Sequence, residues 1–96
     1  MGAEVFFAKS KGKTNQEAFK NAVDDAHHYY GHRGYTGSIA EKNSFVMIDL
    51  PKGKDAEQYA NELIDVDDAR IEDKWGPAGC FYIGKKEYFF FGWASC

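Results

Sequence analysis

The chain has 96 residues, of which 44 % are hydrophobic and 17 % aromatic, and its formal net charge at pH 7 is −3. This length suits one domain with a single core, so we expect residues 1–96 to form a single domain. The negative charge argues against a generic surface for polyanions such as nucleic acid. Residues 1–54 carry eight basic and six acidic groups, whereas residues 55–96 carry four basic and nine acidic groups. We therefore expect an anionic ligand near the first half and a basic partner near the second.

The first half of the chain predicts a strand followed by a long helix. Residues 4–9 are apolar on both faces, which is typical of a central strand. Thr14 and Glu17 have the spacing of a capping box, and apolar residues then recur at helical spacing. We expect a helix over residues 15–30, stopped by Gly31 or Gly34 in a left-handed conformation.

The second half predicts a strand, a helix and a hairpin. Residues 45–50 form the strand, and Pro51 ends it because proline cannot donate to a ladder. Asp55 caps the helix, and the strands at 80–84 and 87–91 join in a hairpin. The order β-α-β-α-β-β predicts an α+β fold, a two-layer sandwich with two helices on one face of a sheet of about four strands.

A long loop over residues 31–42 connects the first helix to the second strand. It holds Gly31, Gly34 and Gly37 at every third position, and it is much longer than the usual connection of about 4–6 residues. Ser38 and Glu41 form a second capping-box pattern, which predicts a short helical turn. Long polar loops on a rigid scaffold often carry binding sites. The loop is therefore the first candidate site.

The glycine spacing matches neither the dinucleotide fingerprint nor the Walker motif, and the C-terminus of the preceding helix repels anions. We hypothesise that Arg33 and Lys42 contact phosphate, that hydroxyl groups hydrogen-bond it, and that an aromatic ring stacks on a base. The alternative is a structural loop whose glycines adopt positive φ angles. The predicted ligand residues are Arg33, Tyr35, Thr36, Gly37, Ser38, Lys42 and Trp75.

The patterns that could indicate catalysis, a metal or another cofactor have simpler structural explanations. The paired carboxylates Asp24-Asp25 and those of residues 65–68 are typical of surface acids near helix ends. His28 and His32 are four residues apart and would share one face of a helix, as two metal ligands often do, but no third ligand is nearby. Cys80 opens an apolar strand, which predicts a buried thiol and not a nucleophile. No Ser-His-Asp arrangement with a strained elbow is present. We expect a protein that is not an enzyme.

The cysteine count and the hydropathy pattern indicate the cellular compartment in which the protein is found. Cys80 and Cys96 are too few for a disulfide framework, and the longest apolar run, residues 88–91, is far short of a membrane span. The first residues do not show a basic region followed by an apolar run of about 7–15 residues, so we expect no signal peptide. We expect a cytoplasmic protein with free thiols and no membrane partner.

The aromatic residues of the C-terminal hairpin predict an exposed apolar patch. Rings alternate along residues 81–83 and 88–91, and only one face of the hairpin is needed to cover the helices. Such a patch suits stacking with RNA bases or contact with protein, and the acidic net charge disfavours RNA. We expect a homo-oligomer formed through this hairpin.

Three segments resemble small phage and prophage accessory proteins of unassigned function. They are GYTGSIAEK at residues 34–42, KWGPAGC at residues 74–80 and FFFGWAS at residues 89–95. The resemblance carries no catalytic motif. It implies a protein that acts in the host cytoplasm, where compact phage proteins disarm immunity by sequestering nucleotide messengers or by blocking a host protein.

Together these observations lead to two functional hypotheses. The first is a non-enzymatic anti-defence protein that sequesters a nucleotide-like immune signal at the 31–42 loop. The second is an inhibitor of a host defence protein, which would use the acidic residues 55–73 against a basic surface.

Overall fold

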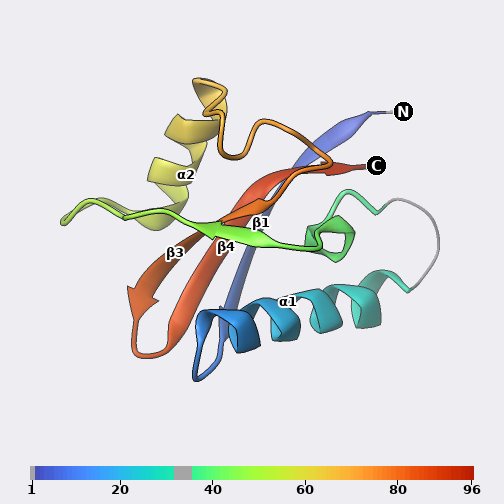
Figure 1. The fold of residues 1–96 in the computed structure, drawn as a ribbon, viewed down its shortest axis with the longest axis horizontal. Helices are drawn as coiled ribbons and strands as arrows, with labels where there is room; N and C mark the ends of the chain where they lie inside the picture. Colours follow the sequence, from blue (N-terminus) through green and yellow to red (C-terminus); the bar gives the residue numbers. More distant parts are fainter. Residues whose placement is uncertain (1, 32–35) are drawn as a thin grey trace.

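The computed structural model describes residues 2–31 and 36–96, and it confirms the predicted α+β class, the four-stranded sheet and the order of the elements (Figure 1). Each predicted helix and strand has a counterpart. The elements are β1 (Ala3–Lys11), helix α1 (Asn15–Tyr30), the 3₁₀ helix η1 (Ile39–Glu41), β2 (Phe45–Met47), helix α2 (Ala56–Asp65), β3 (Ala78–Gly84) and β4 (Glu87–Ser95).

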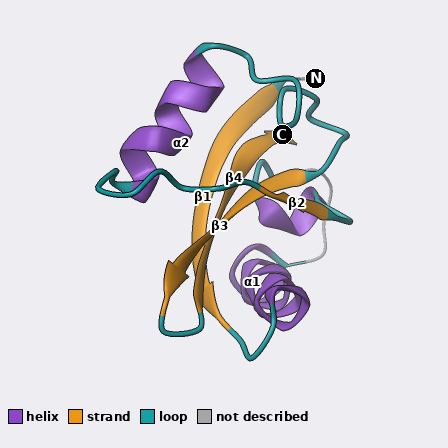
Figure 2. Ribbon diagram, turned by 60° about the vertical axis from the view of Figure 1, so that its left-hand side comes forward, coloured by secondary structure: helices purple, strands orange, loops and turns teal. Residues whose placement is uncertain are grey.

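The sheet is mixed, with strand order β1-β4-β3-β2. Strand β4 pairs antiparallel with β1 and with β3, whereas β2 runs parallel to β3 (Figure 2). The prediction that residues 4–9 form a central strand is therefore wrong, because β1 lies at an edge. Its apolar pattern on both faces has another cause, which is the placement of the helices.

The two helices cover opposite faces of the sheet, so the predicted placement of both helices on one face is wrong. Phe90 and Ala94 of β4 pack in one cluster with α1, whereas Phe89 and Phe91 pack in a second cluster with α2. Successive side chains of a strand point to opposite faces, so the clusters lie on the two sides of β4. Figures 1 and 2 show the sheet between α1 and α2. The fold has three layers.

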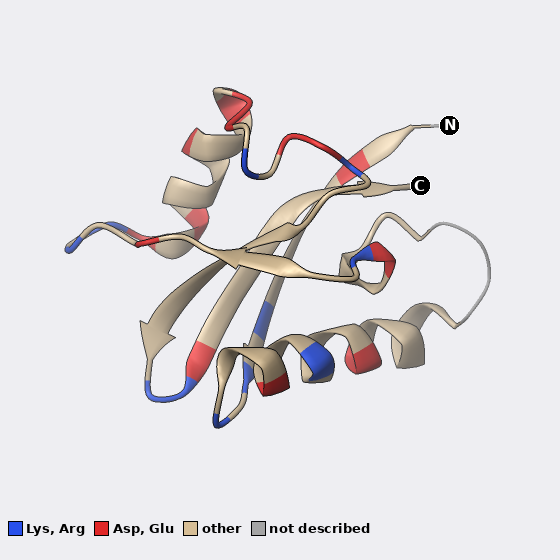
Figure 3. Ribbon diagram, in the orientation of Figure 1, with Lys and Arg blue, Asp and Glu red and all other residues tan. Residues whose placement is uncertain are grey.

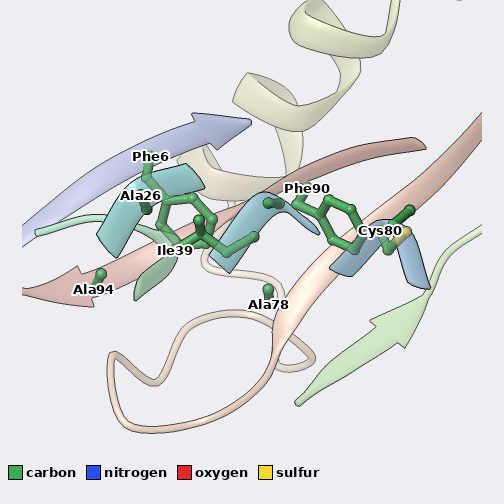
Figure 4. Packing of buried hydrophobic residues seen from close by; sticks show 9 residues of the cluster. Phe6, Ala26, Ile39, Ala78, Cys80, Phe90 and Ala94 are labelled. Atoms are coloured by element: carbon green, nitrogen blue, oxygen red, sulfur yellow. The ribbon is translucent and has the colours of Figure 1, made fainter. Parts of the chain in front are cut away.

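The cluster on the α1 side combines small helix residues with larger strand residues (Figure 4). Ala18, Ala22 and Ala26 are the buried residues of α1, and small side chains at this spacing let the helix approach the sheet closely. Phe90 of β4 and Ile39 of η1 fill the space beside them. The short helix η1 thus belongs to the core.

The predicted helix caps are confirmed. The Glu17 amide donates to Thr14 Oγ1 at 3.1 Å, and the Gln58 amide donates to Asp55 Oδ2 at 3.0 Å. Helix α1 ends at Gly31, which has φ of +79°. These local contacts satisfy backbone groups that a helix end leaves without partners.

The bounds of all four strands differ from the prediction. Strands β1 (Ala3–Lys11) and β3 (Ala78–Gly84) are longer than the predicted residues 4–9 and 80–84. Strand β2 is shorter than residues 45–50, although the Ile48 amide still donates to the Cys80 carbonyl at 2.9 Å. Strand β4 continues beyond residue 91 as far as Ser95. Among the described elements, no helix is long and apolar enough to span a bilayer.

Candidate functional site

The described part of the 31–42 loop is held by an internal hydrogen-bond network. Two of its groups, Thr36 Oγ1 and the Thr36 amide, donate to Glu41 Oε2 at 2.8 and 3.0 Å. Thr36 Oγ1 also lies 2.7 Å from Ser38 Oγ, which in turn accepts the Ala40 amide at 3.2 Å as the cap of η1. The hydroxyls predicted to bind phosphate are therefore occupied, and they face a carboxylate that would repel it.

Gly37 has a structural function in the same loop. Its φ is +69°, and its amide donates to the Ser95 carbonyl at 2.7 Å. A Cβ at this position would lie 2.5 Å from Glu4 Oε2 and 3.1 Å from Cys96 Cβ. Glycine is needed here because the backbone adopts a left-handed conformation against two neighbouring side chains.

Lys42 is buried, with an exposed fraction of 3 %. Its Nζ donates to the carbonyls of Asp73, Lys74 and Gly76, at 3.3, 3.1 and 2.9 Å. An ammonium has three N–H groups, and all three have protein acceptors, which leaves none for a ligand. Burial lowers the pKa of Lys42, and the Asp73 carboxylate partly offsets this effect. This geometry favours a structural function for Lys42 over the predicted phosphate contact, because Lys42 attaches the 73–76 loop to the end of η1.

Trp75 lies on the loop that Lys42 fastens, and its exposed fraction is 60 %. Its amide donates to Asp73 Oδ1 at 2.8 Å, and Lys74 Nζ lies 5.3 Å from the centre of its ring. The ring is thus accessible to a ligand. The other two predicted ligand residues, Arg33 and Tyr35, lie outside the described residues.

A different part of the molecule gathers positive charge. Figure 3 shows basic residues near the turn between β3 and β4, the second half of β1 and the segment before α2. The amide of Gly12 donates to the Lys86 carbonyl at 3.0 Å, which joins the first two of these regions. We call this the lysine end, and its basic residues are Lys9 and Lys11 of β1, Lys52 and Lys54 before α2, and Lys85 and Lys86 of the turn.

A hollow of about 580 Å³ lies at the lysine end. We call it the lysine hollow. Lys9, Lys52 and Lys54 supply its positive charge, Tyr82 and Phe89 are the aromatic residues of its lining, and the start of α2 closes one side. Neither Lys9 nor Lys52 forms an ion pair with another described residue, whereas Lys54 pairs with Glu62 at 3.0 Å. The volume lies within the range of about 300–1,000 Å³ that small-molecule sites occupy. The remaining lining residues are Leu50, Pro51, Gly53, Asp55, Ala56, Glu57, Ile83 and Gly84.

Two lysines beside the hollow adopt an unfavourable backbone conformation. Lys85 and Lys86 have φ angles of 55° and 60°, in the two-residue turn that joins β3 to β4. Such turns prefer Asn-Gly, because a left-handed conformation costs most other residues about 1–2 kcal/mol. Backbone strain often occurs at functional sites, so the unfavourable conformation of these two lysines suggests that their positive charges have a function.

A second hollow, of about 570 Å³, runs between β1 and α1. Its walls include Glu4 and Asp25 together with Phe7, Tyr29 and Tyr30. In this groove two carboxylates outnumber the single lysine, Lys9, whereas the three lysines of the lysine hollow outnumber Asp55 and Glu57, so the groove is the poorer site for an anion.

The aromatic residues of the C-terminal hairpin are mostly internal. Phe89, Phe90 and Phe91 are buried, because β4 is a central strand with a helix on each face. The expected oligomer contact through this hairpin is therefore at odds with the fold, and Tyr82 is the large ring of the hairpin that the structure exposes. Among the described residues, no group of three His, Cys, Asp or Glu side chains is placed to hold a metal.

Cys80 is fully buried, and burial raises the pKa of its thiol to about 12. Cys96 is exposed. We expect a thiol reagent at pH 8 to modify one cysteine in the native protein and both in denaturant, because only the thiolate reacts. Burial raises the pKa of this thiol in the folded state above its ordinary value of 9.0, so its contribution to stability is fully present below about pH 9. That contribution is lost progressively as the pH rises toward 12.

Absorbance titration of native and denatured protein, with Cys96→Ser as the control, tests this expectation. The variant should show no reaction until it unfolds. Equal reaction rates for the two thiols in the native protein would contradict the burial of Cys80.

Comparison with known proteins matches the chain to no family model, no curated protein and no solved structure. Its function is therefore inferred from the chemistry of its surfaces.

Proposed function

We propose that this protein is a non-enzymatic binding protein for a nucleotide-like anion, and that the ligand lies in the lysine hollow. The observation that carries the proposal is the pair of lysines, Lys9 and Lys52, that line a hollow of ligand size and form no ion pair with another described residue. The N-terminus of α2 adds positive potential, because its first amides point out of the helix. The carboxylate of Asp55 reduces this effect, although it is engaged as the cap of that helix.

The aromatic surface favours a nucleotide over a simple anion. Tyr82 is half exposed, and its ring centre lies 5.1 Å from that of Tyr88. A base that stacks on an aromatic side chain gains about 1–3 kcal/mol, and this gain depends little on base identity. The Tyr82 ring lies with Tyr88 on the α1 face of the sheet, whereas Lys9 and Phe89 share the α2 face. A nucleotide would therefore extend around the end of β3, with its phosphate at Lys9 and its base at Tyr82.

A binding role, without chemistry, fits the residues around the hollow. The described residues that line it include no histidine or cysteine to act as a base or nucleophile. Sequestration of an immune signalling nucleotide is the biological role that the resemblance to phage accessory proteins favours. The proposal retains that role and moves the site from the 31–42 loop to the lysine end.

Isothermal titration calorimetry with a panel of cyclic and ADP-ribose-type nucleotides tests the proposal. The double variant Lys9→Ala/Lys52→Ala should weaken binding at least about tenfold, and the effect should shrink as salt rises. Lys20→Ala is the matched control, since Lys20 lies on the exposed side of α1 and pairs with Asp24 at 3.8 Å. Replacing Lys85-Lys86 by Asn-Gly should also weaken binding, while it stabilises the hairpin.

Two results would overturn the proposal. Folded protein that gives no heat with any nucleotide would exclude this class of ligand. Binding that is lost in Arg33→Ala and kept in Lys9→Ala/Lys52→Ala would return the site to the 31–42 loop.

A second candidate is the inhibitor of a host defence protein, and one observation favours it. Helix α2 has no basic residue in its last turn, where Asp65 lies, and Asp67 and Asp68 follow directly. Negative charge at a helix C-terminus opposes the helix dipole, so this arrangement costs stability. Only part of the charge is neutralised, since Arg70 holds Asp68 at 2.8 Å and lowers its pKa to about 2. Under this candidate, inhibition persists in Lys9→Ala/Lys52→Ala and fails after charge reversal of Asp65 and Asp67.

A further inference from the structure

Within the described sheet, one side of β1 has no strand partner, and the register of β1 identifies the backbone groups on that side. The Cys96 amide donates to the Gly2 carbonyl, and the Gly12 amide donates to the Lys86 carbonyl. In an antiparallel ladder, residues that exchange hydrogen bonds alternate with residues that do not. Even-numbered residues of β1 therefore bond to β4, and the odd-numbered residues direct their N–H and C=O groups away from the sheet.

Most of these outward groups have no partner among the residues that the structure describes. The Lys11 carbonyl accepts Asn21 Nδ2 from α1 at 2.9 Å, so that end of the edge is covered. Ala3, Val5, Phe7 and Lys9 make no outward backbone hydrogen bond to any residue that the structure describes. A row of unpaired groups on a regular edge strand is a template for a further strand.

Exposed aromatic side chains flank the same edge on both faces. Phe7 is 40 % exposed on the α2 side, where its ring lies 5.8 Å from that of Phe89. On the α1 side, Tyr29 and Tyr30 are 81 % and 44 % exposed and line the groove beside β1. Apolar surface thus accompanies the unpaired backbone.

We propose that β1 pairs antiparallel with β1 of a second copy, around a two-fold axis at Phe6. In this register Val5 faces Phe7 of the second copy, and Ala3 faces Lys9 of the second copy. All four outward residues then exchange hydrogen bonds, about eight in total. The sheets of the two copies become one continuous sheet.

The strand is complementary to itself in this register, which favours a second copy over an unrelated peptide. On the α2 face, Val5 and Phe7 from each copy form one apolar group of four side chains. On the α1 face, Glu4 lies opposite Ala8. Lys9 and its counterpart lie at opposite ends of the paired segment, roughly 20 Å apart, so no like charges meet.

Hydrogen exchange tests this pairing at single amides. The amides of Phe6 and Ala8 bond to β4 and should be protected at every protein concentration. The amides of Val5, Phe7 and Lys9 should exchange rapidly in dilute protein and become protected as concentration rises. Sedimentation from about 10 µM to 1 mM should show the mass double over the same range.

Phe7→Lys places a cation in the apolar group of four and should raise the dimer dissociation constant at least about tenfold. Tyr82→Lys is the matched control, because it removes another half-exposed ring from a strand that does not enter the contact, and its dimer should persist. Circular dichroism verifies that both variants are folded. A mass that stays monomeric to 1 mM, or a dimer that survives Phe7→Lys and is lost in Tyr82→Lys, would overturn the proposal.

Discussion

Replacing Lys42 with methionine is expected to destabilise the protein by about 3 kcal/mol. The variant keeps most of the aliphatic stem and removes the ammonium that donates to the carbonyls of Asp73, Lys74 and Gly76. Each carbonyl then has to find water or remain unpaired, and the 73–76 loop loses its attachment to the segment after η1. A loss of this size is a large share of the stability of a small domain, which is about 5–15 kcal/mol. Urea denaturation followed by circular dichroism measures it.

Lys20→Met serves as the control, because the Lys20 side chain is 78 % exposed and an exposed ion pair contributes less than about 1 kcal/mol. The comparison also separates two functions of Lys42. Unchanged stability combined with lost nucleotide binding would support the phosphate contact predicted from the sequence. Lost stability supports the structural function that its three carbonyl partners indicate.

Gly79→Val is expected to cost about 3 kcal/mol, because the position has no space for a side chain. Gly79 lies opposite Phe91 in the pairing of β3 with β4, and the Phe91 ring covers it. A Cβ would lie 2.6 Å from Phe91 Cζ and 3.0 Å from Ile71 Cγ2. Both neighbours are buried, so neither can move aside without disturbing the α2 side of the core. Gly79→Ala should show a smaller loss in the same direction.

Gly53→Ala provides the comparison at an open position. A Cβ there would meet nothing within 4 Å, and the cost arises only from a φ of +84°. We expect a loss of about 1 kcal/mol. If thermal melting shows Gly79→Val to be no less stable than Gly53→Ala, the ring of Phe91 does not cover β3 as described.

The sequence predicted the elements whose signals are local. The cap residues Thr14, Ser38 and Asp55 each accept a backbone amide within three residues, so their spacing alone predicted the starts of α1, η1 and α2. The layering was missed, although the run of three consecutive phenylalanines at 89–91 carried a signal for it. A strand with apolar residues on both faces needs a cover on both faces, and this holds for edge strands as well.

The candidate site could be predicted only in part, because its contacts join residues that are far apart in the chain. The partners of Lys42 lie more than 30 residues away, and no local pattern identifies a lysine that is buried in this way. The sequence showed an excess of positive charge in residues 1–54, but it did not show where in the folded protein these charges lie. Lys9 and Lys52 come together only because β1 and the segment before α2 meet at one end of the sheet.

The position of β4 also governs the order in which this fold can form. In the sheet that the structure describes, β4 is the strand partner of β1, so the ladder of β1 must wait until about 75 further residues have been synthesised. During translation β1 and α1 can associate only through side chains, and an apolar strand without a partner stays exposed on the nascent chain. The pairing of β1 with β4 therefore closes a loop that contains most of the chain. Closing a long loop is slow, so we expect slow folding for so small a domain. The arrival of β4 is the step that turns the separate segments into a sheet.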